Sequence, residues 1–335
     1  MSPYLPKIAR GALLISMLSV AGLAGAATDI TIYNAQHVSL TKEWAEQFTR
    51  DTGITVTLRN GKDTELANQI VQEGAASPAD VFLTENSPAM VIVDKAKLFA
   101  RLDAATLAQV PAEFRPGHGR WTGIAARSTV FVYNKDKLPA AGLPKSLMDL
   151  SAPVWKGRWS ASPSGADFQA IVSAVLEMKG EAATLAWLKG MKDNAVIHRG
   201  NRNVLKAVNA GEVESGVIYH YYYFGDQAKT GENSNNVGQH YFKQQDPGAF
   251  VSISGGGVLA SSKQKDAAQR FMKWLTGKQG QEILRTGSSH EYAVGAGVPS
   301  NARLVPLKDL DAPKIDATRL DSGKVVDLMT QAGLL

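Results

Sequence analysis

The 335-residue sequence contains no cysteine. A metal site built on thiolates is therefore excluded, as is any stabilisation by disulfide bonds. A lipid anchor attached to a cysteine after export is excluded for the same reason. Any metal chemistry must use oxygen and nitrogen ligands such as carboxylate, phenolate and imidazole.

Clusters of basic charge are also missing. Lys and Arg number 36 and Asp and Glu number 31, which gives a formal net charge of +5, and the two signs alternate along the chain. A nucleic-acid-binding surface needs basic residues gathered on one face, so nucleic acid is excluded as a partner. We find no low-complexity linker, no convincing internal repeat and no nucleophile–base pair of the Ser/His/Asp kind. The composition is that of an ordinary globular protein with one large or two smaller domains.

No hydrophobic run is long enough and suitably flanked for a membrane span. The run GALLISMLSVAGLAGAA follows Lys7 and Arg10 and contains the small residues Ala24-Gly25-Ala26 near its end. This pattern predicts a cleavable signal peptide over residues 1–26, in preference to an uncleaved anchor or a buried helix. In a bacterium with two membranes, the mature protein is then expected in the periplasm.

Beyond the signal peptide, short apolar strands alternate with amphipathic helices. The patterns predict strands at 29–35, 54–61 and 79–85, and helices at 39–53 and 64–77. This βαβαβ order is typical of a parallel sheet covered by helices, with ligand-binding loops at the carboxyl ends of the strands.

The rest of the chain repeats this alternation less regularly. We expect a strand at 129–138, helices at 164–180 and 182–194, a helix–turn–strand unit at 203–220, a glycine-rich extended segment at 246–262 and a helix pair at 265–286. The layout predicts an α/β protein of two lobes, between which the chain crosses more than once.

Four side chains that bind hard cations follow predicted strands. They are His37 after the first strand, Glu85 at the end of the third, and Tyr221 and Tyr222 after SGVIYH. Two phenolates, a carboxylate and an imidazole suit a small, highly charged cation, for which ferric iron is the obvious candidate. Ca²⁺ and Mg²⁺ would require more carboxylates. Because a phenol has a pKa of about 10, the cation must be a strong Lewis acid to displace its proton.

Each of these residues also has a purely structural interpretation. A histidine at a strand end often satisfies backbone groups in a turn, and Glu85 is placed to cap the helix after it. A run of tyrosines in a strand usually divides between core and surface, because alternate residues face opposite sides. Tyr221 and Tyr222 diverge less only if the strand ends there and a helix begins. The residue pattern alone leaves both interpretations open.

Several stretches occur in order through the mature chain: YNAQH, SPADVFLTENSPA, ARSTVFVYNKDKL, PSGADFQAIV, YHYYYFG and DPGAFVSISGGGVL. They resemble the bacterial periplasmic ferric-ion-binding proteins, also called bacterial transferrins, which are the substrate-binding components of iron(III) ABC importers. The resemblance implies a type II-like periplasmic binding protein, with a mostly parallel sheet flanked by helices in each lobe and a ligand cleft between lobes. It places residues 27–128 and about 252–303 in the N-terminal lobe, and residues 129–251 and about 304–335 in the C-terminal lobe.

The resemblance also implies a set of iron ligands. The histidine of the Y-N-x-Q-H motif, the glutamate after the A-D-V-F strand and the two adjacent tyrosines correspond to His37, Glu85, Tyr221 and Tyr222. A small exogenous anion, phosphate or carbonate, is expected to complete the octahedral shell around Fe(III).

The expected anion contacts lie in the second lobe and at the crossing between lobes. The turn Ser164-Gly165-Ala166 precedes a predicted helix, and free N–H groups at a helix start favour an anion. The resemblance adds Asn201 and, where some relatives have an arginine, Arg127. The chain departs from the family pattern at two places: Tyr219 stands where an asparagine is frequent, and Asn86 stands where a glutamine is frequent.

The resemblance implies a monomeric protein that captures ferric iron and delivers it to an inner-membrane ABC permease and its ATPase. No enzymatic step is expected. Two other functions are alternatives to the capture of ferric iron. One is a binding protein of the same fold for phosphate, thiamine or a polyamine, and the other is a periplasmic hydrolase that uses His37 and Glu85 as acid and base.

Overall fold

The computed structural model describes residues 1–3 and 29–335. The predicted signal peptide falls largely on residues 4–26, which lie outside the described residues. The first part of the described chain forms β1 (Asp29–Asn34), α1 (Val38–Thr52), β2 (Thr55–Asn60), α2 (Asp63–Glu73), β3 (Val81–Leu83), α3 (Ser87–Lys95) and α4 (Ala104–Leu107). The middle forms β4 (Thr122–Asn134), β5 (Trp159–Ala161), α5 (Ala166–Asn194), β6 (Ala195–Ile197), α6 (Asn201–Ala210), β7 (Ser215–Tyr219), α7 (His220–Gln227) and β8 (Val237–His240). The last part forms β9 (Val251–Val258), α8 (Lys265–Thr276), α9 (Lys278–Thr286) and α10 (Ser322–Gln331).

Most of these elements match the predicted alternation. The two helices expected at 164–180 and 182–194 form α5, which is broken at Gly180, where φ is 78° and ψ is 171°. Only glycine adopts this conformation without strain, and it ends one helical segment and starts the next. The strand predicted at 129–138 begins earlier in the structure, since β4 starts at Thr122.

The strands follow the order β2-β1-β3-β9-β4-β7-β5-β6, and β8 pairs with β4. The outer strands pair in parallel: β1 with β2 and β3, and β5 with β6 and β7. The two central strands, β4 and β9, pair with their neighbours in antiparallel fashion. The sheet is therefore mixed, with parallel pairs at both ends and an antiparallel centre.

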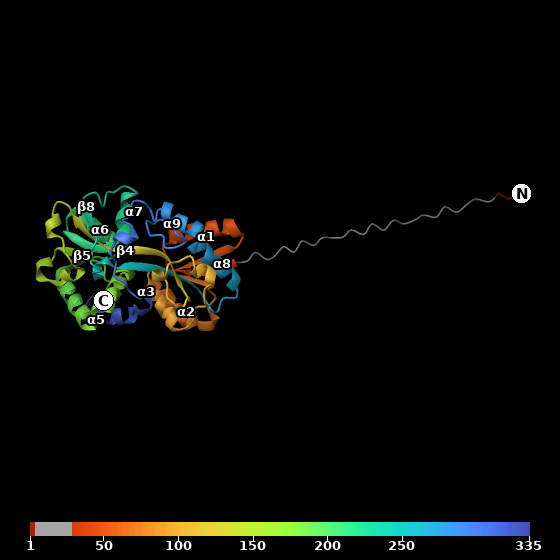
Figure 1. Cartoon of the computed structure of the whole chain (residues 1–335), viewed down its shortest axis with the longest axis horizontal. Coiled ribbons are helices and arrows are strands. Elements are labelled where there is room, and N and C mark those ends of the chain that lie inside the picture. Colours follow the sequence, from red (N-terminus) through yellow and green to blue (C-terminus); the bar gives the residue numbers. More distant parts are fainter. Residues whose placement is uncertain (4–28) are drawn as a thin grey trace.

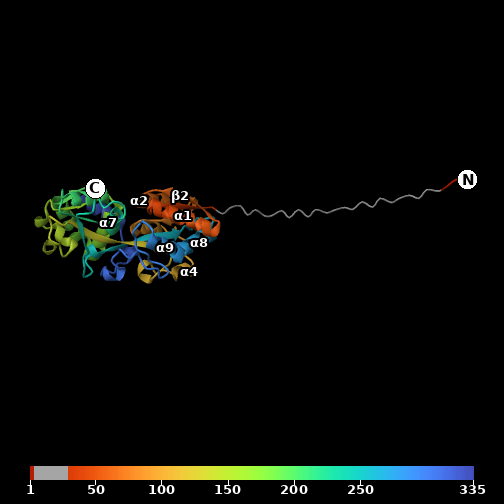
Figure 2. The same ribbon diagram turned by 90° about the horizontal axis from the view of Figure 1, so that it is seen from above.

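The long strand β4 runs from one half of the molecule into the other (Figures 1 and 2). Its first part, Thr122–Ser128, pairs with β9, and its second part, Thr129–Tyr133, pairs with β7. On the β9 side lie α1, α2, α8 and α9, and on the β7 side lie α5 and α6. The change of partner after Ser128 marks the passage between the two halves.

Each half has its own core. In the first, Trp44 and Phe48 of α1 pack with Phe271 of α8 against the buried sides of β1 and β3. In the second, Phe168 and Trp187 of α5 stack with ring centroids 6.1 Å apart. The separate cores allow each half to keep its shape if the halves move relative to each other.

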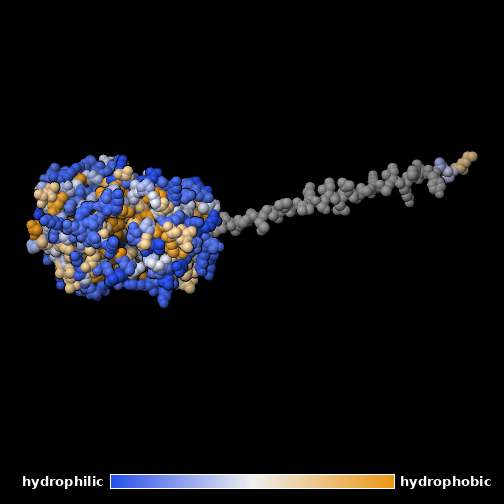
Figure 3. Space-filling model, in the orientation of Figure 1, coloured by the Kyte–Doolittle hydropathy of each residue, from blue (hydrophilic) through white to orange (hydrophobic). Residues whose placement is uncertain are grey.

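Within residues 1–3 and 29–335, no helix combines the length and the apolar character that a membrane crossing requires. The face shown in Figure 3 is largely hydrophilic, with hydrophobic residues in small patches. Such a surface is ordinary for a protein exposed to water.

Candidate metal centre

His37 lies in the loop between β1 and α1, at the position that precedes the first helical residue. Its backbone angles, φ −49° and ψ 121°, are not helical, and its N–H donates to Gln36 Oε1 at 2.7 Å. The apolar face of α1 is buried, which fixes the helix and therefore this loop. The His37 ring points with Nε2 toward Glu85, at 2.8 Å from Oε1.

Glu85 lies in the loop between β3 and α3. Asp63, the first residue of α2, holds this loop: its carboxylate accepts the backbone N–H of Glu85 at 2.8 Å and that of Asn86 at 3.0 Å. Burial and the neighbouring charge of Glu85 raise the pKa of Asp63 to about 8. Strand ends on the same edge of the sheet thus bring His37 and Glu85 together, as predicted.

Tyr221 and Tyr222 lie in the first turn of α7. The strand β7 ends at Tyr219 and the helix begins at His220, which is the condition under which the two tyrosines point in similar directions. Their ring centroids are 4.3 Å apart. Tyr221 Oη donates to Glu85 Oε1 at 3.0 Å, so the four predicted ligands form one group that joins the two halves.

Asp167 completes this group, although the sequence analysis did not include it. It is buried in the first turn of α5, and its Oδ2 accepts from Tyr221 Oη at 3.1 Å and from Tyr222 Oη at 3.0 Å. Two amides also bind the carboxylate: Asn201 Nδ2 donates to Oδ2 at 2.8 Å, and Asn86 Nδ2 donates to Oδ1 at 3.2 Å. Burial and the charge of Glu85 raise the pKa of Asp167 to about 6.

One of the predicted anion contacts, Asn201, binds this carboxylate, and the predicted turn lies just before Asp167 in the chain. Gly165 precedes the first residue of α5, and Ser164 and Ala166 flank it in the turn. Asn201 is the first residue of α6, and the contact that was expected to hold an exogenous anion is made instead to Asp167. The role of Ser164, Gly165 and Ala166 as anion contacts stays a prediction.

Arg127 is fully buried on β4 and lies between two carboxylates. Nη1 is 3.1 Å from Glu85 Oε1 and Nη2 is 2.5 Å from Glu291 Oε2. The guanidinium also lies over the ring of Tyr221, 5.5 Å from its centroid. It thus supplies positive charge beside the candidate ligands, and its role as an anion contact stays a prediction.

Tyr219 and Asn86, the two positions at which the chain departs from the family pattern, are in contact. Tyr219 is fully buried, and its Oη donates to Asn86 Oδ1 at 3.3 Å. Ser252 Oγ donates to the same oxygen at 2.8 Å, which turns the amide nitrogen of Asn86 toward Asp167. Tyr219 therefore supports the position of Asp167 through Asn86.

The spacing of the five side chains suits an octahedral ion. Along the series His37 Nε2, Glu85 Oε1, Tyr221 Oη, Asp167 Oδ2 and Tyr222 Oη, neighbouring atoms are 2.8, 3.0, 3.1 and 3.0 Å apart. A small octahedral cation holds its ligands at about 2.1 Å, so ligand atoms along an edge are about 3.0 Å apart. The same distances suit hydrogen bonds, which hold the group together while the phenols keep their protons.

The phenols are central to this site. Among residues 1–3 and 29–335, no group of three or more His, Cys, Asp or Glu side chains is by itself arranged to hold a metal ion, and Glu85 and Asp167 are joined only through the phenol of Tyr221. Burial, followed by the charges of Asp167 and Glu85, raises the pKa of Tyr221 and of Tyr222 above the ordinary value. A metal ion that replaces the protons of these phenols must therefore be a strong Lewis acid. This requirement favours a trivalent cation over a divalent one.

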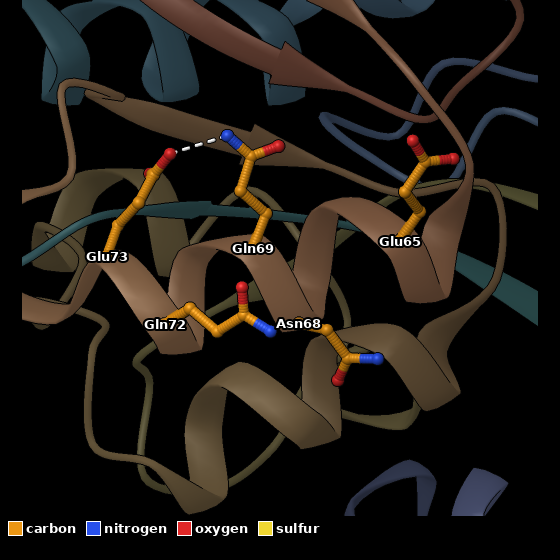
Figure 4. Close-up of a pocket in the computed structure, with 5 residues that line it drawn as sticks. All are labelled: Glu65, Asn68, Gln69, Gln72 and Glu73. Atoms are coloured by element: carbon orange, nitrogen blue, oxygen red, sulfur yellow. Dashed lines mark hydrogen bonds between the residues drawn. The ribbon is translucent and has the colours of Figure 1, made fainter.

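A surface hollow along α2 lies away from these ligands. Its lining residues are Glu65, Asn68, Gln69, Gln72 and Glu73 (Figure 4). Gln69 Nε2 donates to Glu73 Oε1 at 2.5 Å, so two of the polar side chains that line the hollow are hydrogen-bonded to each other. It contributes none of the candidate ligands.

The fold and the site together define a two-lobed solute-binding protein. The family model of bacterial extracellular solute-binding proteins matches residues 76–316. The Fe(3+)-binding periplasmic protein of Serratia marcescens is 72% identical over 322 residues, which cover 96% of this chain and 95% of that protein. The major ferric iron-binding protein of Neisseria meningitidis is 37% identical over 328 residues, or 97% of this chain and 98% of that protein.

Solved structures agree with these relatives. The iron-bound HitA of Pseudomonas aeruginosa matches with a TM-score of 0.87 and 40% identity, over 92% of this chain and 100% of that chain. The chain therefore belongs to the bacterial periplasmic ferric-iron-binding proteins, which are named as binding proteins and not as enzymes. The two-lobed α/β fold predicted from the sequence is confirmed.

Proposed function

We propose that this protein captures one ferric ion between its lobes in the periplasm and delivers it to an ABC importer. The convergence of His37, Glu85, Tyr221 and Tyr222 carries the proposal, because two loops of one half and the first turn of α7 in the other half bring these side chains together. Membership of the ferric-iron-binding family supports the choice of cargo over phosphate, thiamine or a polyamine.

Asp167 is the further ligand in this proposal. Phosphate or carbonate was expected beside Asn201, but the Asp167 carboxylate already accepts from Asn201 and from both phenols. With Glu85, Tyr221 and Tyr222 it offers four negative charges to Fe³⁺, and Arg127 lies 3.1 Å from Glu85 beside them. No exogenous anion is then required for charge, and the five side chains leave one of the six octahedral positions open.

Iron bridges the two lobes in this arrangement. The predicted division into residues 27–128 plus about 252–303 and residues 129–251 plus about 304–335 is supported by the change of partner on β4 between Ser128 and Thr129. His37 and Glu85 belong to one lobe, and Tyr221, Tyr222 and Asp167 to the other, so binding draws the lobes together by hinge motion. The closed monomer is the form that the permease and its ATPase would recognise.

The direct test adds ferric citrate to the metal-free mature protein and records the visible spectrum. We expect a reddish or purple tyrosinate-to-iron absorption band that saturates at one iron per chain, with the iron confirmed by elemental analysis. Phosphate, thiamine and polyamines are the control ligands, and none should raise the melting temperature as ferric iron does. A colourless protein without bound iron contradicts the proposal.

Iron affinity should fall steeply as pH falls. In the closed site Tyr221 and Tyr222 hold their protons because burial raises their pKa values. Burial lowers the pKa of His37, but hydrogen bonds to Glu291 and Glu85 outweigh it and raise the value to about 10. Ferric iron must displace these protons, about three near pH 7, so the intrinsic binding constant should fall about a thousandfold per pH unit.

The slope of the logarithm of the iron affinity against pH is measured by competition with a chelator whose own protonation is known. Below pH 6 the slope should increase further, because Asp167, with a pKa of about 6, then also binds a proton. Tyr222→Phe should reduce the slope by one proton, whereas Tyr223→Phe, the neighbouring phenol, should leave it unchanged. An affinity independent of pH contradicts coordination by phenolates.

A further inference from the structure

Glu291 is a fully buried carboxylate directly behind His37. It lies in the irregular segment after α9, which is attached to β4 by a pair of backbone hydrogen bonds between Ala126 and Tyr292, 3.0 and 2.8 Å long. This attachment places Glu291 beside Arg127, the residue after Ala126. The segment is thus bonded to the strand that crosses between the lobes, and its carboxylate faces the metal site.

Both oxygens of Glu291 have defined partners. Oε1 is 3.0 Å from His37 Nδ1, and Oε2 is 2.5 Å from Arg127 Nη2. Two polar side chains also bind Oε2: Gln36 Nε2 at 3.2 Å and Ser254 Oγ at 3.4 Å. A carboxylate held at so many points has little freedom to rotate.

This arrangement decides which nitrogen of His37 is available. An imidazole binds a metal through either ring nitrogen, and the hydrogen bond made by the other nitrogen selects between them. In the metal-free site both ring nitrogens face a carboxylate and donate to it, Nδ1 to Glu291 and Nε2 to Glu85. Glu85 is itself a candidate ligand, so an ion bound by Glu85 can displace the Nε2 proton, whereas Nδ1 keeps its proton and its bond to Glu291. Nε2 is the atom that lies 2.8 Å from Glu85 Oε1, within the candidate ligand group.

A simpler role for Glu291 would be to neutralise Arg127. The geometry goes beyond that role, because Arg127 already has a carboxylate partner in Glu85 and because Glu291 gives a separate oxygen to His37. Gln36 strengthens the same arrangement: its Oε1 accepts the backbone N–H of His37 at 2.7 Å while its Nε2 binds Glu291. Ring and backbone of His37 are therefore held by one connected network.

We propose that Glu291 is a positioning residue for iron capture, which holds the His37 ring with Nε2 directed at the ferric ion and Nδ1 protonated. The inference rests on the proposed function, in which His37 is an iron ligand. Outer-shell partners of this kind change metal affinity by about 10–100-fold when they are replaced.

The test measures ferric affinity for Glu291→Gln in two backgrounds, the wild type and His37→Ala. We expect a loss of about 10–100-fold in the wild-type background and almost none in the His37→Ala background, because Glu291 then has no ring to position. Glu214→Gln is the control, since Glu214 also forms an ion pair with an arginine, the half-buried pair with Arg158 at 2.8 Å, away from the site. This control should keep the wild-type affinity.

A spectroscopic measurement tests the tautomer directly. Ga³⁺ is a diamagnetic substitute for Fe³⁺, and ¹⁵N NMR of the gallium-loaded wild type should show one His37 nitrogen bound to metal and the other, Nδ1, carrying a slowly exchanging proton. In Glu291→Gln this proton should exchange faster. Should Glu291→Gln fail to fold, Glu291→Asp keeps the charge for Arg127 but shortens the reach to Nδ1, and the same two results are expected.

Equal losses of affinity in the wild-type and His37→Ala backgrounds would overturn the inference, because Glu291 would then act through Arg127 or the fold and not through His37. An unchanged affinity of Glu291→Gln would overturn it as well. A wild type that binds neither iron nor gallium is a different result, since it refutes the proposed function itself.

Discussion

Replacing Tyr221 and Tyr222 together with phenylalanine should abolish both the visible absorption band and tight iron binding. The band arises from electron transfer between phenolate and Fe³⁺, so it requires at least one tyrosinate ligand. The two phenolates also supply two of the negative charges that the buried trivalent ion needs, and a phenyl ring supplies none. We expect the double variant to bind iron at least a thousandfold more weakly, which chelator competition measures together with the spectrum.

The single variants and a neighbouring tyrosine give the controls. Tyr221→Phe and Tyr222→Phe should each keep a weaker, shifted band, whereas Tyr223→Phe should be indistinguishable from the wild type. The fold should survive, because both rings keep their apolar contacts and lose only hydrogen bonds to Glu85 and Asp167. A double variant that stays coloured with iron at wild-type affinity would show that other groups hold the ion.

Periodicity was sufficient to predict most of the fold. The helices α1, α8 and α9 have one apolar face each, and β1 and β3 are short buried strands, so their patterns are local. The start of β4 was missed because its first residues, TGIAARS, are buried throughout and do not alternate. Their strand conformation depends on pairing with β9, more than a hundred residues later, which no local pattern reveals.

The proximity of two candidate ligands was predictable for a similar reason. His37 and Glu85 follow strands, and parallel strands bring their carboxyl ends to one edge, so sequence position implied proximity. Glu291 follows no strand, and only the bridge between Ala126 and Tyr292 brings it to the site. No spacing within the sequence indicates such a contact.

Asp167 was missed because acidic residues are common in the first turn of a helix, where they interact favourably with the helix dipole. Its local context is therefore ordinary. The informative signal was its position directly after the turn Ser164–Ala166, where the resemblance placed an anion. A carboxylate at that point competes with any exogenous anion for the amide of Asn201.

Replacing Asp167 with alanine should make iron binding dependent on an added anion. In the wild type, affinity should be the same with and without phosphate or carbonate, because the Asp167 carboxylate already occupies the place beside Asn201 and both phenols. Removing it leaves a cavity lined by amide and phenol donors beside the helix start, which favours a small anion. Without added anion, we expect a loss of at least about a hundredfold, more than an outer-shell contact usually contributes.

The measurement is a chelator competition in carbonate-free and phosphate-free buffer, repeated with each anion added. Asp167→Ala should recover much of its affinity with phosphate or carbonate and show a shifted absorption maximum, because a different ligand then binds iron. Asp167→Asn should recover less, since the amide keeps the volume but not the charge. Asp193→Asn, an exposed position near the other end of α5, is the control and should resemble the wild type. A wild type whose affinity rises with phosphate or carbonate would contradict the role of Asp167 and support an exogenous anion, for which this side chain must move aside.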